Sequence, residues 1–421
     1  MNRRFLIIIL LLLLSLFLAA KGIVINPARA PGIDYYKHYY AARHVVEGKT
    51  PYRGDGLFLA FNYPQFVAWL NLPLALFPSA EAAEPAWDIM NALLVVISAL
   101  IIMFGYRPAH YEALKNDRSV TKYDLPWWIL SLFAFFFYHP TIAGLRQGNV
   151  SSWDLFFITV AGWAVIKNKD YAAGVFIALS SLIKLLPALL IIPFIFGRRK
   201  KVIIGAVSAW GIYFLALLVT RTLDNEWFYF TGVIPKIGTK WAHVSYSIPH
   251  VMFRHLFPSL YTNPDITEGL SALWSVIIAG TFAGICFKAR RLWHDHNNDI
   301  LIVAYGMILL PLLPPLLEYL HFVWSLPALM ATLIIIRSGS IKRTPAILIV
   351  AGFSGIALAG PFAEIVRLGR LSPIALAPFF ALGIYVVYSW KILKKAGRKG
   401  ENLSQSSDQV LNFSGDDSIN R

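Results

Sequence analysis

The chain has 421 residues, of which 57 % are apolar and 14 % are charged. Soluble proteins carry about 25 % charged residues, so this composition excludes a disordered chain and argues against a soluble enzyme. The formal charge is +15, and the basic residues form short clusters between apolar runs, a pattern that orients membrane proteins rather than one that binds nucleic acid. A chain with the single cysteine Cys286 forms no intramolecular disulfide and no cysteine-based metal site.

Ten apolar runs are predicted to span the membrane. They cover residues 5–25, 86–106, 125–140, 150–166, 202–220, 271–288, 300–316, 319–336, 344–360 and 373–390. The first run also resembles a signal peptide, but an uncleaved span is preferred because many more spans follow it. Several runs have about 17 residues, the short end for crossing about 30 Å of hydrocarbon. The sequence therefore predicts an all-α, polytopic membrane protein.

The basic clusters predict the orientation of these spans. If each cluster is cytoplasmic, both termini are cytoplasmic too, and the chain is a multi-pass protein of the plasma membrane. The outer loops are then residues 26–85, 141–149, 221–270 and 361–372. We expect one membrane domain over residues 1–397, followed by a cytoplasmic tail over 398–421. The tail is rich in Ser, Asn and Asp, so we expect it to be disordered.

Residues 171–197 lie between two basic clusters that are both predicted to be cytoplasmic. Twenty-seven helical residues reach only about 40 Å, which is too short for two complete crossings. The segment is therefore predicted to be a re-entrant helical hairpin that turns near Lys184 and Pro187, because proline interrupts a helix. Non-helical backbone at membrane depth survives inside protein or against a wet cavity, so Lys184 is expected to face a cavity.

Lys184 is also the most informative single residue, because an ionisable group within an apolar segment is costly and indicates function. A lysine that merely snorkels to the interface is the alternative. Phosphate is its expected partner, since lysine binds phosphate as a point charge.

The first outer loop contains a second candidate, Asp34. Tyr35, Tyr39, Ala42 and Val46 recur at helical spacing, so a short interfacial amphipathic helix is predicted, with Asp34 at its start. Asp34 is then either a helix N-cap or a general base at the membrane surface. Both interpretations are compatible, since a capping carboxylate stays ionised.

Further polar residues lie in the outer loops. Arg146, Gln147 and Asn149 form a segment more polar than a tight connection needs, which suits an anionic or hydroxyl-bearing ligand. A snorkelling or headgroup-binding Arg146 is the alternative. Tyr63 is suited either to stacking on a sugar or to the headgroup belt. Arg254 is placed to share a helix face with His250.

Other motifs are missing from the sequence. It has no HExxH, DxD, Walker or GxSxG motif, so no metal site or cofactor is predicted. His321 and Glu318 are expected to pair with each other rather than to bind a metal.

An ordered set of short motifs resembles glycosyltransferase family 87, a family of the glycosyltransferase-C superfamily. The motifs are Asp34-Tyr35-Tyr36, Tyr39-Tyr40-Ala41-Ala42, Gly48 with Pro51-Tyr52, Tyr63-Pro64, Arg146-Gln147-Gly148-Asn149, and Gly174 with Lys184 and Pro187. The resemblance covers roughly residues 30–390, and it is looser over 241–255 and 315–327. It rests on the order of the motifs and on the matching topology, because no single motif is very specific.

The resemblance implies a transferase that moves one hexose, expected to be mannose, from a polyprenyl phosphate to a lipid or glycan acceptor at the outer face of the membrane. It implies that Asp34 is the catalytic base. Lys184, Arg146 and Arg254 are then the cations available to the donor phosphate, with Gln147, Asn149 and Tyr63 as further substrate contacts. The implied partners are the sugar donor, the acceptor and membrane lipids, without nucleic acid.

Two other functions stay open. A lipid-linked oligosaccharide ligase works at the same face but transfers a preassembled glycan. A lipid or solute transporter shares the polytopic build, but it predicts inverted repeats, and the sequence shows none. A non-enzymatic scaffold gives no reason for an aspartate and a buried lysine in these places.

Overall fold

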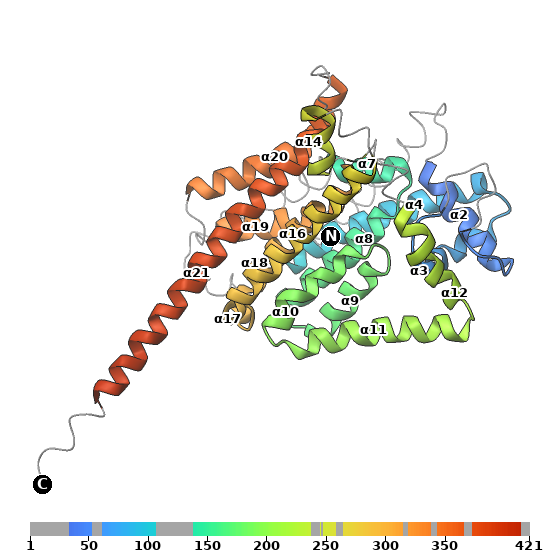
Figure 1. Ribbon diagram of the computed structural model, residues 1–421. Helices are drawn as coiled ribbons and strands as arrows, with labels where there is room; N and C mark the ends of the chain where they lie inside the picture. Colours follow the sequence, from blue (N-terminus) through green and yellow to red (C-terminus); the bar gives the residue numbers. More distant parts are fainter. Residues whose placement is uncertain are drawn as a thin grey trace, which may run out of the picture.

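The computed structural model describes residues 33–52, 61–106, 138–236, 245, 247–257, 264–314, 319–337, 343–365 and 373–413. Within these ranges the protein is helical and contains no strand (Figure 1). The longer helices are α2 (Ile33–Val46), α4 (Ala80–Leu100), α7 (His139–Gln147), α8 (Ser151–Ile166), α9 (Asp170–Ser181), α11 (Lys200–Val219), α14 (Ile248–Leu256), α16 (Pro264–Lys288), α18 (Asp299–Leu309), α19 (Ser325–Arg337), α20 (Arg343–Ile365) and α21 (Ala377–Phe413).

Short helices and 3₁₀ or π turns connect them. These are α3 (Gln65–Leu70), η1 (Leu72–Leu76), η2 (Ile101–Gly105), η4 (Leu186–Ile191), α10 (Ile192–Phe196), α12 (Leu223–Phe228), η5 (Tyr229–Val233), α17 (Arg290–Trp293), η7 (His296–Asn298), η8 (Leu310–Leu312), η9 (Tyr319–Trp324) and η10 (Pro373–Leu376).

Three of the described helical stretches are long and apolar enough to cross a membrane: Ala80–Gly105, Lys200–Val219 and Asp265–Lys288. Four shorter apolar helices are Ser151–Ile166, Leu186–Phe196, His321–Ile336 and Thr344–Ala359. The expected span 5–25 lies outside the described residues, and so does the expected span 125–140 up to residue 137. The all-helical membrane architecture is thus confirmed, whereas the number of ten spans stays a prediction.

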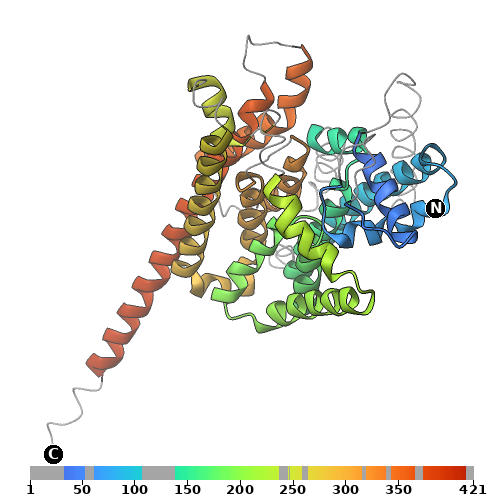
Figure 2. The same ribbon diagram turned by 45° about the vertical axis from the view of Figure 1, so that its right-hand side comes forward.

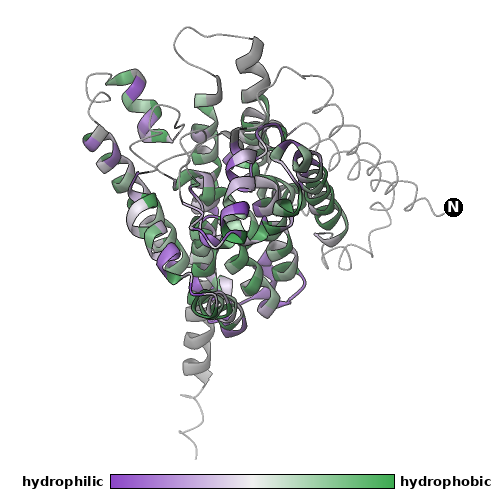
Figure 3. Ribbon diagram, turned by 90° about the vertical axis from the view of Figure 1, so that its right-hand side faces the viewer, coloured by the Kyte–Doolittle hydropathy of each residue, from purple (hydrophilic) through white to green (hydrophobic). Residues whose placement is uncertain are grey.

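The apolar residues of these helices face two different surroundings. One large core joins α8, α9, α18, α19, α20 and α21, and hydrophobic residues colour most of the bundle in Figure 3. By contrast, α11 exposes a row of apolar side chains that includes Ile212, at 69 % exposure, and Val219, at 75 %. An exposed apolar surface of this kind suits contact with lipid chains.

Residues 33–52 and 61–76 fold into α2, α3 and η1 and form a second core with part of the segment 221–270. Tyr52 stacks on Tyr229 with ring centroids 6.2 Å apart, and both side chains are buried. In Figure 1 the helices α2, α3 and α12 gather at one side of the bundle, and the turned view of Figure 2 keeps them together. The two long loops therefore build one small subdomain.

Three expected boundaries differ from the structure. Helix α4 begins at Ala80 rather than at residue 86, because the side chain of Ser79 accepts a hydrogen bond from the backbone of Ala82 and caps it. The segment 141–149, expected to be a loop, largely belongs to α7. The described part of the expected tail, up to Phe413, continues helix α21 and extends away from the bundle in Figure 1.

The segment 171–197 has the hairpin geometry that the sequence predicts. Helix α9 ends at Ser181, the chain bends over 182–185, and η4 and α10 bring it back. Arg199, after the hairpin, forms an ion pair with Asp170, before it, so both ends of the segment lie together. Gly174 lets α9 approach α11 closely, since a Cβ there would lie 1.9 Å from the carbonyl oxygen of Val202.

Candidate active site

Asp34 lies in the first turn of α2, one residue inside the helix. The Nζ of Lys37 is 2.5 Å from one carboxylate oxygen, and the Nδ2 of Asn149 donates to the other at 2.5 Å. Burial alone raises the pKa of Asp34, but the Lys37 charge and these hydrogen bonds outweigh burial and lower it. The site therefore holds an ionised carboxylate whose two oxygens are both oriented.

The amide of Asn149 connects several parts of the site. Its Nδ2 donates to the hydroxyl of Tyr63 at 3.1 Å as well as to Asp34. Its Oδ1 accepts from the backbone and hydroxyl of Ser151, at 3.1 Å and 2.7 Å. These partners fix the direction of the amide, with the nitrogen toward Asp34.

A glycine turn brings Asn149 into this position. Gly148 ends α7 with φ +65°, the left-handed conformation that glycine adopts freely. A Cβ at Gly148 would lie 2.8 Å from the Cβ of Tyr35, and the indole of Trp87 donates to its carbonyl oxygen at 3.0 Å. The Arg-Gln-Gly-Asn segment is therefore divided: Asn149 is buried at Asp34, whereas Arg146 and Gln147 are exposed at the end of α7.

His38 occupies an aromatic enclosure beside Asp34. It is fully buried, with ring centroids 5.1 Å from Tyr63 and 5.4 Å from Trp87. Burial and then the Lys37 charge lower its pKa to about 3, and the Lys184 charge acts in the same direction. His38 is therefore neutral at pH 7, and it lies within the electrostatic reach of both Asp34 and Lys184.

Lys184 lies in the bend of the hairpin, as the sequence predicts, between α9 and η4. Its Nζ is 5.2 Å from the ring centroid of Trp324, a distance at which an ammonium is attracted by the ring. His321 stacks on the same indole, with ring centroids 5.3 Å apart. The charges of Lys184 and Lys37 both act on the His321 imidazole. The hairpin bend and η9 thus meet at this indole.

Arg254 lies elsewhere in the described structure. Its Nη2 donates to the backbone oxygen of Ser245 at 2.9 Å, and its charge acts on His250. His250 in turn bonds to the hydroxyl of Ser271 at 3.0 Å. Through His250 these contacts connect Arg254 to α16. By contrast, Asp34 contacts Lys37 of α2 and Asn149, and Lys184 contacts Trp324 of η9. The donor phosphate remains a prediction as the partner of Arg254. The pair of His321 with Glu318 also remains a prediction, because Glu318 lies outside the described residues.

The structure adds residues that sequence reasoning did not single out. Lys37 is buried against Asp34 and lies 5.0 Å from the ring of Tyr63; its i, i+3 spacing from Asp34 was the available signal. Asp154 is fully buried in α8 and accepts from the indole of Trp324 at 2.5 Å. Like Lys184, Asp154 is an ionisable residue within an apolar run, and the same argument applies to it.

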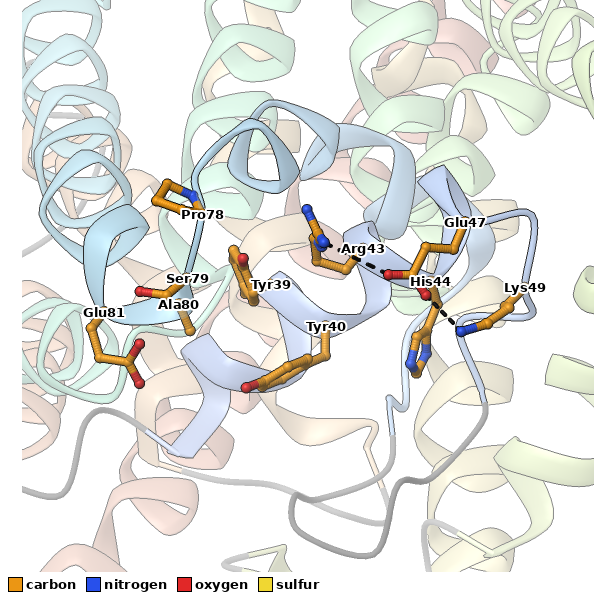
Figure 4. A pocket seen from close by; sticks show the side chains of 10 residues that line it. All are labelled: Tyr39, Tyr40, Arg43, His44, Glu47, Lys49, Pro78, Ser79, Ala80 and Glu81. Atoms are coloured by element: carbon orange, nitrogen blue, oxygen red, sulfur yellow. Dashed lines mark hydrogen bonds and ion pairs between the residues drawn. The ribbon is translucent and has the colours of Figure 1, made fainter.

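A cavity of about 510 Å³ lies on another face of α2 (Figure 4). Arg43 follows Asp34 by two and a half helical turns, so these side chains point to opposite faces. The cavity is thus separated by the helix from the Asp34 carboxylate. Its lining consists of Tyr39, Tyr40, Arg43, His44, Glu47, Lys49, Pro78, Ser79, Ala80 and Glu81.

No group of three or more His, Cys, Asp or Glu side chains suited to a metal ion occurs in the described ranges. The side chains of this arrangement offer acid–base and electrostatic chemistry. An ionised carboxylate can accept a proton from a hydroxyl, and an ammonium in a water-poor site can stabilise a developing negative charge.

Comparison with known proteins finds two relatives that are mannosyltransferases by name. The chain is 22 % identical over 316 residues to a polyprenol-phosphate-mannose-dependent α-(1-2)-phosphatidylinositol mannoside mannosyltransferase of Mycobacterium tuberculosis, over 71 % of this chain and 69 % of that protein. It is 27 % identical over 169 residues to GPI mannosyltransferase 1 of Aspergillus oryzae, over 39 % of this chain and 34 % of that protein.

The model of glycosyltransferase family 87 matches residues 61–315. This range contains Tyr63, Asn149, Lys184 and Arg254, whereas Asp34 precedes it and Trp324 follows it. The match covers well over half of the chain. This protein is therefore a membrane glycosyltransferase, and it belongs to glycosyltransferase family 87.

Proposed function

We propose that the protein transfers a single mannose from a polyprenyl phosphate to a lipid or glycan acceptor at the outer face of the plasma membrane. The observation that carries this proposal is the geometry of Asp34, whose two carboxylate oxygens are held by Lys37 and Asn149 and which therefore offers an oriented proton acceptor. The printed name of the mycobacterial relative supports the donor. Both relatives are mannosyltransferases by name, which supports the sugar.

In the proposed reaction, Asp34 acts on the attacking hydroxyl and Lys184 acts on the leaving phosphate. The acceptor hydroxyl attacks the anomeric carbon of the sugar and gives its proton to the Asp34 carboxylate. The bond from that carbon to the phosphate oxygen breaks, and the phosphate leaves with the electron pair. Lys184 stabilises the charge that grows on the leaving phosphate, which is most effective in a site with little water.

The side chains around Asp34 prepare it for this step. Lys37 and Asn149 keep it ionised and hold both oxygens in place. They must share the carboxylate with the incoming hydroxyl, which a carboxylate with four lone-pair sites allows. Arg146 and Gln147, exposed nearby at the end of α7, are proposed contacts of the donor or the acceptor.

The orientation is proposed from the charges of the connecting segments. The hairpin ends carry Lys169 and Lys200, which favour the cytoplasmic side, and the bend with Lys184 then points away from the cytoplasm. A lipid-carried donor suits this side, because its chain lies between helices while its phosphate stays at the interface.

Transfer from radiolabelled polyprenyl-phosphate mannose to a lipid and glycan extract tests the proposal with the purified full chain. Asp34→Asn keeps the side-chain shape but removes the base, so transfer should fall by about a hundredfold or more. Lys184→Met should weaken the binding of the donor and slow transfer.

The matched control is Lys201→Met, which removes an exposed lysine at the base of the hairpin and should leave transfer unchanged. All variants should reach the membrane and melt near the wild-type temperature. Near-normal transfer by Asp34→Asn would exclude the general base, and transfer of whole oligosaccharides in place of one labelled sugar would favour the ligase.

A further inference from the structure

We infer that Asp154 is a positioning residue that aligns Lys184 with the donor phosphate through Trp324 and Ser180. This inference rests on the proposed role of Lys184 in binding the donor. Asp154 is fully buried in the first turn of α8, inside an apolar helix, where an ionisable side chain requires specific partners.

The partners of Asp154 come from two other elements. One oxygen accepts a hydrogen bond from the indole nitrogen of Trp324 at 2.5 Å. The other accepts from the hydroxyl of Ser180. Both donors are themselves buried. A carboxylate in the first turn of a helix usually stabilises the N-terminus of that helix. The Asp154 carboxylate instead connects α8 to η9 and α9.

Both donors are directly connected to Lys184. Trp324 forms the ring that its ammonium faces at 5.2 Å. The backbone oxygen of Ser180, whose hydroxyl donates to Asp154, accepts a hydrogen bond from the backbone N–H of Lys184 at 3.1 Å and thereby holds the start of the hairpin bend. Asp154 thus fixes the surface beside the ammonium and the backbone that carries it. A lysine side chain that is already restricted loses less conformational entropy when it binds phosphate, so the entropic cost of binding is lower.

Charge adds to this geometric role. The Asp154 carboxylate and the Lys184 ammonium attract each other electrostatically. Trp324 and Ser180 each contact both residues. A buried cation benefits from a counter-charge before its ligand arrives. Because Asp154 is engaged with Trp324 and Ser180, it attracts the ammonium without occupying the position that the phosphate takes.

The test is the affinity of the purified full chain for polyprenyl phosphate, which carries no sugar and therefore reports on the phosphate site. Asp154→Asn should weaken this affinity about tenfold, the size expected for one charge-assisted hydrogen bond. In a Lys184→Met background the same change should have no further effect, because Asp154 acts through Lys184.

A second variant keeps the inference testable if Asp154→Asn does not fold. Trp324→Phe keeps a ring beside the ammonium but removes the N–H that Asp154 binds, so it should lower the affinity in the same way. Asp299→Asn is the matched control: it removes a carboxylate that is also buried but pairs with Arg199. Arg199 keeps its second partner Asp170, which closes the hairpin, so this variant should leave the affinity unchanged.

The outcomes separate the two proposals. Wild-type affinity in Asp154→Asn or in Trp324→Phe overturns the positioning role, as does a tenfold effect that persists without Lys184. An equal loss in Asp299→Asn shows a general loss of packing and overturns it too. If Lys184→Met itself binds polyprenyl phosphate like the wild type, the proposed phosphate contact fails, and the positioning role fails with it.

Discussion

At the scale of single residues, the site depends on a carboxylate that is buried and yet ionised. Burial disfavours the charge of Asp34, and Lys37 together with Asn149 restores it. Lys37 comes from the next turn of the same helix, so the pair is local, whereas Asn149 comes from the turn after α7, more than a hundred residues away in the sequence. The two supports can therefore be removed separately, and each removal has a distinct effect.

Removing Lys37 should shift the pH dependence of the reaction. Lys37→Met takes away the charge that lowers the Asp34 pKa and leaves the burial that raises it, so the pKa should rise. The base then becomes protonated at a higher pH. The acid limb of the profile of kcat/KM against pH should move upward, measured by transfer from labelled polyprenyl-phosphate mannose.

Lys49→Met is the control for that experiment. Lys49 follows the same helix but pairs with the exposed Glu47 at 2.7 Å, away from Asp34. Its profile should match that of the wild type. An unmoved acid limb in Lys37→Met would show that another group controls the limb.

At the scale of secondary structure, the hairpin of α9, η4 and α10 decides where Lys184 lies. The closure is stabilised by the ion pair of Arg199 with Asp170 and by the tight contact at Gly174. Arg199 is buried and also pairs with Asp299 of α18, so the base of the hairpin is attached to the bundle. Pro187, at the start of η4, has no backbone N–H and cannot continue the helix of α9, which favours the bend.

The hairpin predicts that both of its ends are accessible from one side of the membrane. In a Cys286→Ala background, Asn168→Cys and Lys200→Cys, both at exposed positions, should react with an impermeant thiol reagent applied to the cytoplasmic side. Leu185→Cys, at the exposed bend, should not react from that side. Labelling of positions 168 and 200 from opposite sides would replace the hairpin with a complete crossing.

At the scale of the whole molecule, two loops that are far apart in the sequence form one subdomain. The Glu226 carboxylate of α12 accepts from the backbone N–H of Gln65 and from the hydroxyl of Tyr213, each at 2.9 Å. The same Tyr213 hydroxyl accepts from the backbone N–H of Phe66 at 3.2 Å. Glu226 and Tyr213 thus satisfy the start of α3, which has no side-chain cap of its own.

Removing Glu226 should loosen this subdomain. Glu226→Ala leaves buried donors without their acceptor, which costs about 1–3 kcal/mol, so the melting temperature should fall. Transfer should fall too, because Tyr63, next to α3, supports Asn149 and hence Asp34. Asp224→Ala is the comparison, since Asp224 is exposed on the same short helix. Equal melting curves for both variants would argue against this role of Glu226.

The sequence alone determined the all-helical membrane architecture, a helix with Asp34 near its start and the hairpin with Lys184 at its bend. These features are local: hydropathy, helical spacing and the reach of a helix all act within a short stretch of chain. The sequence did not determine the number of membrane spans, because several apolar runs are short enough to be either a membrane-spanning helix or a buried helix.

Only the tertiary structure decided which polar residues meet. It brought Asn149 to Asp34 and separated it from Arg146 and Gln147, because Gly148 reverses the chain between them. It also joined Asp154 to Trp324, which is 170 residues away. Such pairs depend on how helices pack, and helix packing is decided by side-chain contacts between distant segments that no local pattern records.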